Sequence, residues 1–298
     1  MPDVVYDAIL GSGVNLRQVT NSSFDPKVES LAGRMSGAAV ISDQFIVSSQ
    51  PEASLSTVDI GGFLTAFGVV GAVVNNGANV TIPFQKRARA GTFVGAGANM
   101  VVKGITDCPV VLNPQTITAP RQGAPTAQGQ VLFLSSDGMV TPYSETVNQT
   151  LAGQLFSAMY GLGPVYINGD LVPRQVGFSV TFGLGWSEPQ NYEGSVFASD
   201  IFLETIDPVI EVQVEDFDLL ASILGGASIT NVTAYLRKRA SGGTYVADAT
   251  AQHIKFTFAG GLIKPQAMSA QETKHGNAGL RLEGRTLVAS TASAVTAP

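Results

Sequence analysis

Residues 79–94, NVTIPFQKRARAGTFV, are repeated later in the chain as residues 231–246, NVTAYLRKRASGGTYV. Nine of the sixteen aligned positions are identical. In both segments, alternating apolar and polar residues lead into a basic run, which is typical of a strand that ends in a polar hairpin turn. The sequence therefore predicts that the same strand and hairpin occur twice in one chain.

The repeat extends well upstream of these segments, where matching residues are separated by a constant 157 positions. The matching positions are Arg17-Gln18-Val19 with Arg174-Gln175-Val176, Ser42-Asp43 with Ser199-Asp200, Phe45 with Phe202, Pro51 with Pro208, and Asp59 with Asp216. Between Gly68 and Asn79 the separation falls to 152, so the second copy lacks five residues. So long a period indicates duplicated domains. We expect a first domain over residues 1–140, a linker over 141–164 and a second domain over 165–298.

Each copy is expected to be mainly β with one helix. Alternation at 80–85 and 232–237 predicts a half-buried strand, and Pro83, which has no N–H, predicts an edge position or a bulge. Further strands are expected to begin at Thr92 and Thr244, after the hairpins. Apolar residues at 60, 63, 64 and 67 have helical spacing, which positions 217, 220, 221 and 224 preserve. The copies therefore predict two tandem β-sandwich or barrel-forming domains, each with one packing helix.

Other segments have weaker patterns. Strands are expected at 53–57, 130–134, 177–182, 210–214, 254–259 and 280–282. Residues 151–162 have some helical periodicity. The Pro- and Gln-rich residues 114–129 and the related residues 265–276 predict long loops or arms.

Composition limits the class of protein. Hydrophobic residues make up 45% of the chain and charged residues only 13%, so part of the surface is expected to be covered by another protein. The net charge of −6 argues against a protein that reads nucleic-acid sequence, which would present a basic face. An acidic surface would instead let nucleic acid pass without binding.

The sequence contains no pattern of catalytic, metal-binding or cofactor-binding residues. The single cysteine, Cys108, cannot form an internal disulfide, and His253 and His275 have no metal-ligand spacing. The Gly-rich stretches at 11–16, 95–100 and 183–188 complete no nucleotide-binding motif and are interpreted as turns. Acidic residues cluster at Glu211, Glu215, Asp216 and Asp218, and the last three are interpreted as a helix start, where carboxylates favour the helix dipole. With no leader and no long apolar run, we expect a soluble, cytoplasmically made protein that is not an enzyme.

The two basic hairpins are the candidate contact sites between subunits. Their residues are Lys86, Arg87 and Arg89 in the first copy and Arg237, Lys238 and Arg239 in the second. In one interpretation the charges only keep a strand edge solvated and prevent aggregation. In the other they pair with an acidic surface of the next subunit and fix its register.

Three segments at the end of the chain carry a resemblance to a family. Residues 234–246, AYLRKRASGGTYV, are followed by 253–263, HIKFTFAGGLI, and by a small-residue tail, LVASTASAVTAP, at 287–298. With the expected β-rich domains, this overall pattern resembles the tail tube proteins of tailed bacteriophages. The resemblance implies domains of two packed sheets flanked by a helix, with six neighbouring domains closing a barrel around a lumen. A chain with two such domains would form the ring as a trimer.

The resemblance implies a structural virion protein of the phage tail, made in the host cytoplasm and stacked into a tube through which DNA passes. Its expected partners are further copies of itself, other tail proteins such as the tape measure and tail terminator, and phage DNA that passes through the lumen without sequence-specific binding. No cofactor and no membrane are expected. Two alternatives stay open: a distal tail or baseplate ring protein of the same fold, or a two-domain carbohydrate- or cell-surface-binding module.

The hairpin hypothesis predicts the behaviour of one double variant. Charge reversal by Arg87→Glu with Arg239→Glu should abolish assembly, because the salt bridges to the next subunit would become repulsive, yet leave thermal unfolding by circular dichroism unchanged. Negative-stain electron microscopy gives the assembly readout. Normal assemblies from the variant would contradict a contact between subunits and leave the interpretation that the charges only keep a strand edge solvated.

Overall fold

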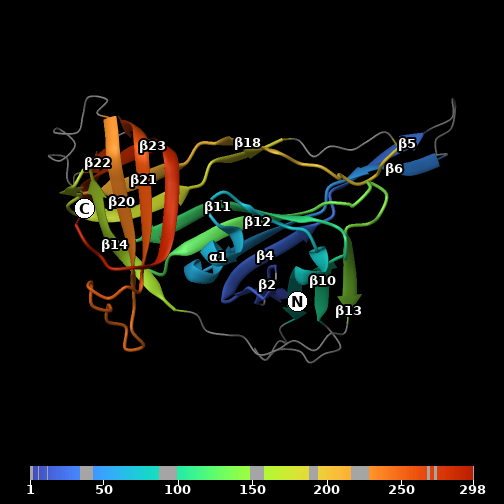
Figure 1. Ribbon diagram of the computed structural model, residues 1–298, viewed down its shortest axis with the longest axis horizontal. Helices are drawn as coiled ribbons and strands as arrows, with labels where there is room; N and C mark the ends of the chain where they lie inside the picture. The colour runs from blue at the N-terminus through green and yellow to red at the C-terminus, as the bar shows by residue number, and fades with distance from the viewer. Residues whose placement is uncertain are drawn as a thin grey trace.

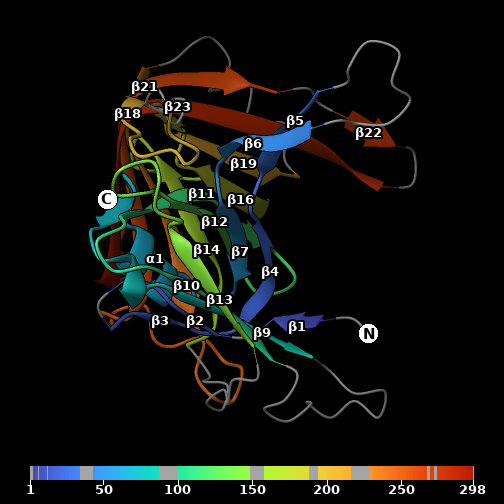
Figure 2. The same cartoon turned by 90° about the vertical axis from the view of Figure 1, so that its right-hand side faces the viewer.

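The computed structural model describes residues 3–5, 7–11, 13–33, 43–86, 99–147, 158–187, 194–215, 228–266, 269–271 and 274–297. Over these residues the chain is mainly β, as expected, with one α-helix and several antiparallel sheets (Figures 1 and 2). We call β1 to β13 the first half of the chain and β14 to β23 the second half.

The first half contains β1 (Asp3–Val5), β2 (Ala8–Ile9), β3 (Asn15–Leu16), β4 (Val19–Asp25), β5 (Val28–Gly33), β6 (Asp43–Ser49), β7 (Glu52–Thr57), α1 (Ile60–Phe67), β8 (Ala72–Val74), the 3-10 helix η1 (Gly77–Asn79), β9 (Thr81–Lys86), β10 (Met100–Gly104), β11 (Val110–Pro120), β12 (Thr126–Phe133) and β13 (Tyr143–Val147). The second half contains β14 (Tyr160–Ile167), β15 (Asp170–Leu171), β16 (Gln175–Thr181), β17 (Leu184–Trp186), β18 (Leu203–Ile206), β19 (Val209–Val214), β20 (Ser228–Lys238), β21 (His253–Pro265), β22 (Ser269–Gln271) and β23 (Lys274–Ser293).

One large sheet includes strands from both halves of the chain. Its order is β15-β14-β20-β21-β23-β19-β16-β11-β12-β7-β4, with β22 on β23 and β8 on β11. A smaller sheet has the order β13-β10-β9-β2-β3, with β1 also on β9. Two separate ribbons, β5–β6 and β17–β18, complete the described strands. The predicted linker range 141–164 contains β13 and the start of β14, and the predicted domain boundaries stay predictions.

The hydrophobic core also draws on both halves. On β12, Ala127, Val131 and Phe133 are buried, while the alternate residues Gln128 and Gln130 lie on the opposite, polar face of the sheet. Helix α1 covers the apolar face through Phe63 and Phe67, whose stacked rings are 4.4 Å apart. Gly129 makes this packing possible, because a Cβ there would lie 2.6 Å from the Phe67 ring.

The predicted helix at 60–67 is confirmed as α1, and its end groups explain its bounds. The Asp59 carboxylate accepts a hydrogen bond from the Gly62 N–H at 3.0 Å and another from the Arg17 N–H at 3.2 Å. At the other end, Gly68 has φ 66° and donates its N–H to the carbonyl of Leu64. The matching helix expected at 217–224 lies outside the described residues.

Most of the other predicted strands are confirmed with longer or slightly shifted bounds. Residues 53–57 fall in β7, 130–133 in β12, 177–181 in β16, 210–214 in β19, 254–259 in β21 and 280–282 in β23. The first predicted basic hairpin and the strand expected from Thr92 lie outside the described residues.

The prediction of long arms at 114–129 and 265–276 was wrong. Residues 114–129 belong to the hairpin β11–β12, and β22 with the start of β23 covers most of the described part of 265–276. The Thr and Gln residues face the polar side of the sheet, and the buried positions of this stretch are few: Pro114, Ile117, Ala119, Pro125, Ala127 and Gly129. Pro114 is tolerated because the register shifts there.

Several further predictions need correction. Residues 160–162 are the start of β14, not helix, and Leu184–Trp186 form β17, not a turn. The hairpin after β20 is present, but Tyr245 makes only an isolated bridge with Arg239, and no strand follows. Strand β9 is an inner strand, and Pro83 lies in the gap between its pairings with β1 and β2.

Strand β20 is buried on both faces at 232–236, where a half-buried strand was expected. On the unexpected face, the hydroxyl of Tyr235 donates to the Thr296 carbonyl at 3.0 Å and its ring packs edge-on against Tyr166. The end of the chain thus covers a face that local alternation assigned to solvent.

The Asp59 cap yields a prediction about stability. Asp59→Ala should lower the free energy of unfolding by about 2 kcal/mol, because it removes the helix cap and leaves the Arg17 N–H without its partner. Asp170→Ala, which removes an exposed carboxylate on β15, is the control. Equal urea midpoints for the two variants would contradict the role assigned to the cap.

Candidate functional site

The two halves of the chain are joined edge to edge where β11 pairs with β16. In this joint Thr118 lies opposite Ser179 and Pro120 opposite Gly177. Two further backbone hydrogen bonds close its ends: Arg121 N–H to the Val176 carbonyl at 2.7 Å and Phe182 N–H to the Gln115 carbonyl at 3.1 Å. The joint thus gives both strands a partner on an edge that would otherwise be open.

Side chains beside the joint add an ion pair and a close backbone approach. Nη1 of Arg121, which follows β11, lies 3.2 Å from the carboxylate of Glu215, which follows β19. At Gly177 an added Cβ would be 2.8 Å from the Ala119 carbonyl oxygen, so the two strands approach closely only because this residue has no side chain.

Among the described strands, four members of the large sheet have a partner on one side only, namely β4, β8, β15 and β22. Strand β4 pairs with β7 on one side only, and β22 pairs with β23 on one side only. Along β4, Thr20, Asn21 and Ser23 are exposed, and Asp25 is its one charged residue. The usual guards of a strand edge, an inward lysine or a proline, are absent from β4. The edges of β4 and β22 are therefore available for pairing with another chain.

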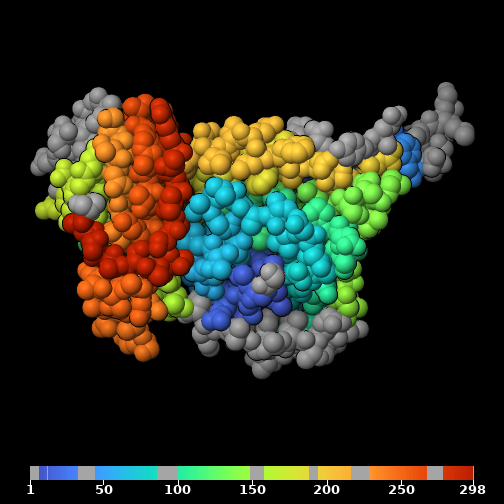
Figure 3. All heavy atoms as spheres, viewed as in Figure 1, coloured from blue at the N-terminus to red at the C-terminus, as the bar shows by residue number. Residues whose placement is uncertain are grey.

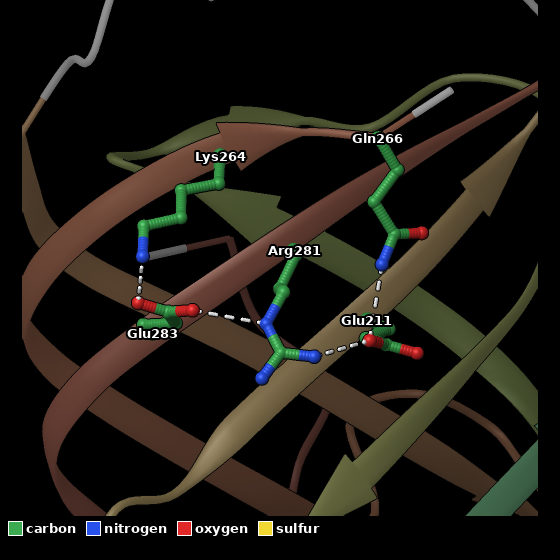
Figure 4. A network of polar contacts seen from close by, with 5 residues as sticks. All are labelled: Glu211, Lys264, Gln266, Arg281 and Glu283. Carbon is green, nitrogen blue, oxygen red and sulfur yellow. Dashed lines mark hydrogen bonds and ion pairs between the residues drawn. The ribbon is translucent and has the colours of Figure 1, made fainter. Parts of the chain in front are cut away.

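The polar face of the large sheet carries a network of charges on β19, β21 and β23 (Figure 4). Nζ of Lys264 lies 2.5 Å from the Glu283 carboxylate, which also accepts from Nε of Arg281 at 3.0 Å. Nη1 of Arg281 donates to Oε1 of Glu211 at 2.9 Å, and the same oxygen accepts from the amide of Gln266 at 3.0 Å. Each cation of the network therefore has a carboxylate partner.

The charges of this network shift the pKa of two of its members. Hydrogen bonds from Lys264 and then from Arg281 hold the pKa of Glu283 below its ordinary value. The hydrogen bond from Arg281 to Glu283 in turn raises the pKa of the Arg281 guanidinium. Because the pKa of Glu283 is lowered on folding, the pairing is complete near neutral pH and is lost as the pH falls through that lowered pKa.

On the part of this face formed by β11, β12 and β7, the side chains are neutral or form ion pairs. Thr116 and Gln128 lie within hydrogen-bond distance of each other, and Gln130 donates to Glu52. Glu52 also pairs with Lys27, whose Nζ lies 2.7 Å away. A depression of about 630 Å³ lies beside the joint, lined by Thr118, Arg121, Ser179, Glu211, Gln213 and Glu215 among others.

The basic residues proposed as subunit contacts have different surroundings. Arg237 pairs with Asp248 at 2.7 Å, and both Arg237 and Arg239 lie over the ring of Tyr245, at 4.6 and 4.9 Å from its centroid. The Lys238 backbone N–H donates to Nδ1 of His253. The structure thus brings the second hairpin's arginines together on one aromatic ring.

Of the first hairpin, Arg87 and Arg89 lie outside the described residues. Lys86 ends β9, where its backbone pairs with Asp3. A role for either hairpin in contacts between subunits stays a prediction.

The histidines, the cysteine and the acidic residues that were weighed as catalytic or metal-binding candidates lie, where the structure describes them, in strands, in the core or in contacts already described. His253 is fully buried at the start of β21, with Nε2 3.1 Å from the Ala247 carbonyl, and His275 lies in β23 instead of the expected polar loop. Cys108 is buried. Glu211 and Glu215 belong to the contacts described above, and Asp216 and Asp218 lie outside the described residues. In the part of the chain that the structure describes, no three His, Cys, Asp or Glu side chains are placed to hold a metal ion.

No protein-family model matches the chain, and no curated protein matches it significantly. Among the described residues no helix is both long and apolar enough to cross a membrane.

The close approach at Gly177 predicts how the joint can be loosened. Gly177→Val should cost about 1 to 3 kcal/mol of stability, since the new side chain meets the backbone of β11. It should also speed amide hydrogen exchange in residues 116–119 and 177–181. Ser179→Val, on a partly exposed position of the same strand, is the control. Unchanged exchange in the Gly177 variant would show that the joint does not depend on this contact.

Proposed function

We propose that the chain is a structural, self-assembling protein of a bacteriophage tail, a tail tube subunit with two tandem domains that stacks in rings around a lumen. The observation that carries the proposal is the joint between β11 and β16. It supports the proposal because it pairs one edge of one predicted copy with the opposite edge of the other, in an arrangement that further chains can continue.

Strand order supports the proposed duplication. In the first half the neighbours run β4-β7-β12-β11, and in the second half β16-β19-β23, followed by β21 and β22 on β23. The β4–β7 pairing has its irregularity between Val19 and Asn21, and β16–β19 has one between Gln175 and Gly177. Gln18 and Arg174, which precede these irregularities, both have φ near +50° (φ 50° and 46°). The pairing registers therefore align β4 with β16 at a separation of 156 residues, one fewer than the 157 of the sequence repeat. In this proposal β16 is the counterpart of β4.

Pairing registers identify the counterpart of β11 in the same way. Thr57 lies opposite Ala127 and Val214 opposite Ala278, which makes β23 the counterpart of β12 with a separation of 151 residues. Thr118 lies opposite Thr126 in the first half, and Ser269 lies opposite Asn277 in the second. The separation is again 151, so β22 is the counterpart of the part of β11 that pairs with β16.

The unpaired edges of β4 and β22 are therefore the counterparts of the two edges already joined inside the chain. If the internal joint repeats between chains, β4 of one chain pairs with β22 of the next. The register of the joint then places Ser23 opposite Ser269 and Asn21 opposite Gln271. Such a contact joins different surfaces, so it generates a ring when the rotation closes.

Ring closure accounts for several features together. Three chains with two domains each would give a ring of six domains in which the edges of β4 and β22 are paired, so the unguarded edge of β4 would be covered. The polar face of the sheet suits a lumen for DNA, because Lys264 and Arg281 are neutralised by carboxylates and do not offer free cations to phosphates. DNA would thus pass without tight binding.

A distal tail or baseplate ring protein of the same fold would use the same joint, and it is distinguished by forming single rings instead of stacked tubes. A carbohydrate-binding module would need an exposed aromatic platform. The only tryptophan, Trp186, lies against Gly71 and packs on the cluster of Val111, Leu134 and Ala198, which gives that alternative little support.

The proposal is tested at the free edge of β4. In the joint, the Val176 carbonyl and the Phe182 N–H point toward β11. Because backbone groups alternate in direction along a strand, the N–H and carbonyl groups of residues 178 and 180 point toward β11 as well. Their counterparts on β4 are residues 22 and 24. Ser22→Pro removes an N–H that points away from β7, so it should leave the folded chain intact and prevent assembly.

Wild-type protein should form rings or tubes with a central hole in negative-stain electron microscopy, and Ser22→Pro should remain dispersed with an unchanged circular dichroism melt. Ser22→Ala keeps the N–H and should assemble like the wild type. Dispersed wild-type protein at high concentration, or normal tubes from Ser22→Pro, would contradict the proposal.

A further inference from the structure

The ribbon β5–β6 is exposed and apolar. Val28, Leu31, Phe45, Ile46 and Val47 are each 47 to 56% exposed. The ribbon extends beyond the body of the chain, at the end far from β20, β21 and β23 (Figure 1). Exposed apolar side chains gathered on one short element indicate a surface that a partner covers.

The other ribbon, with the segment that leads to β18, is already covered by the first half. The Ser49 N–H donates to the Val196 carbonyl and the Ser135 N–H donates to the Ala198 carbonyl, both at 2.8 Å. A small apolar cluster, which includes Trp186 and Ile201 from the ribbon segment and Val111, Leu132 and Leu134 from the first half, seals the contact. The yellow atoms of this segment lie along the first half in Figure 3.

The two ribbons correspond in detail. Each follows one of the two counterpart strands, β5 after β4 and β17 after β16. The β5–β6 register shifts between Glu29 and Ser30, and the β17–β18 register shifts between Gly185 and Trp186. This correspondence makes Ser30 the counterpart of Trp186 and Gln44 the counterpart of Ile201.

We propose that β5–β6 docks on the second half of another copy of this chain, over Leu262 of β21, which lies opposite Glu283 of β23. This inference rests on the proposed function, because it repeats between chains the contact that β17–β18 makes within one. Leu262 is the counterpart of Val111 at the separation of 151 residues. Val111 is 1% exposed beneath the internal ribbon, whereas Leu262 is 50% exposed.

The surface that β17–β18 covers within the chain and the surface proposed to receive β5–β6 on another chain differ in polarity. Leu132 and Leu134 of the first half correspond to Glu283 and Arg285, so the contact between chains combines one leucine with charged neighbours. The ribbon carries Glu29 beside its apolar side chains, which suits a surface that contains Arg285. The contact between chains is therefore more polar than the internal one and more easily reversed.

Cysteine cross-linking tests the contact. Gln44→Cys and Leu262→Cys are made in separate chains, mixed under assembly conditions and treated with a short bis-maleimide. In the control, Val288→Cys takes the place of Leu262→Cys. Val288 is similarly exposed, but it lies on β23 opposite Thr257, away from the Glu283 that lies opposite Leu262. Cys108 is buried and should not react, which unmodified wild-type protein verifies.

We expect dimers from the 44–262 pair at about tenfold or more the yield of the 44–288 pair, because docking raises the effective concentration of the two thiols. Rings or tubes without this preference would overturn the ribbon contact and leave the proposed tube function standing. Wild-type protein that does not assemble, together with no cross-link, would overturn both.

Discussion

The pairing of β11 with β16 is the interaction on which the rest of the structure depends. Because the backbone groups of an edge strand need partners, the two halves of the chain complete each other's sheets at this joint. The shared sheet fixes the shared core beneath it, to which α1 contributes Phe63 and Phe67. It also leaves β4 and β22 as two edges of complementary type. The proposed assembly is the repetition of one contact that the chain already makes with itself.

Charged side chains on the large sheet are also arranged in pairs between neighbouring strands. The chain has few charged residues, and on the polar face of the large sheet Lys264 and Arg281 share Glu283 and Glu211 between neighbouring strands. Paired charges hold strands in register without presenting a basic surface to the solvent. A lumen lined in this way would neither bind DNA tightly nor repel it strongly at short range, in keeping with the proposed role as a conduit.

Local patterns predicted a good part of the fold. The spacing of apolar residues before Gly68 identified α1, and alternation identified β7, β12, β16 and β19. Residues 114–129 were missed because their apolar side is reduced to a few positions, so composition alone resembled a loop. The joint and the docked ribbon leave no local signal, since they depend on strands distant in the sequence. The hairpin arginines were found by their repetition, but their packing on Tyr245 was not foreseen.

The most direct test of the central claim is an electron cryomicroscopy map of the assembled protein, at a resolution that separates strands. We predict one sheet continuing from chain to chain, with β4 beside β22 and Ser23 opposite Ser269 across the boundary. An assembly in which the edge of β4 faces solvent, or pairs with β4 of another chain, would contradict the claim that the internal joint is the template for the joint between chains.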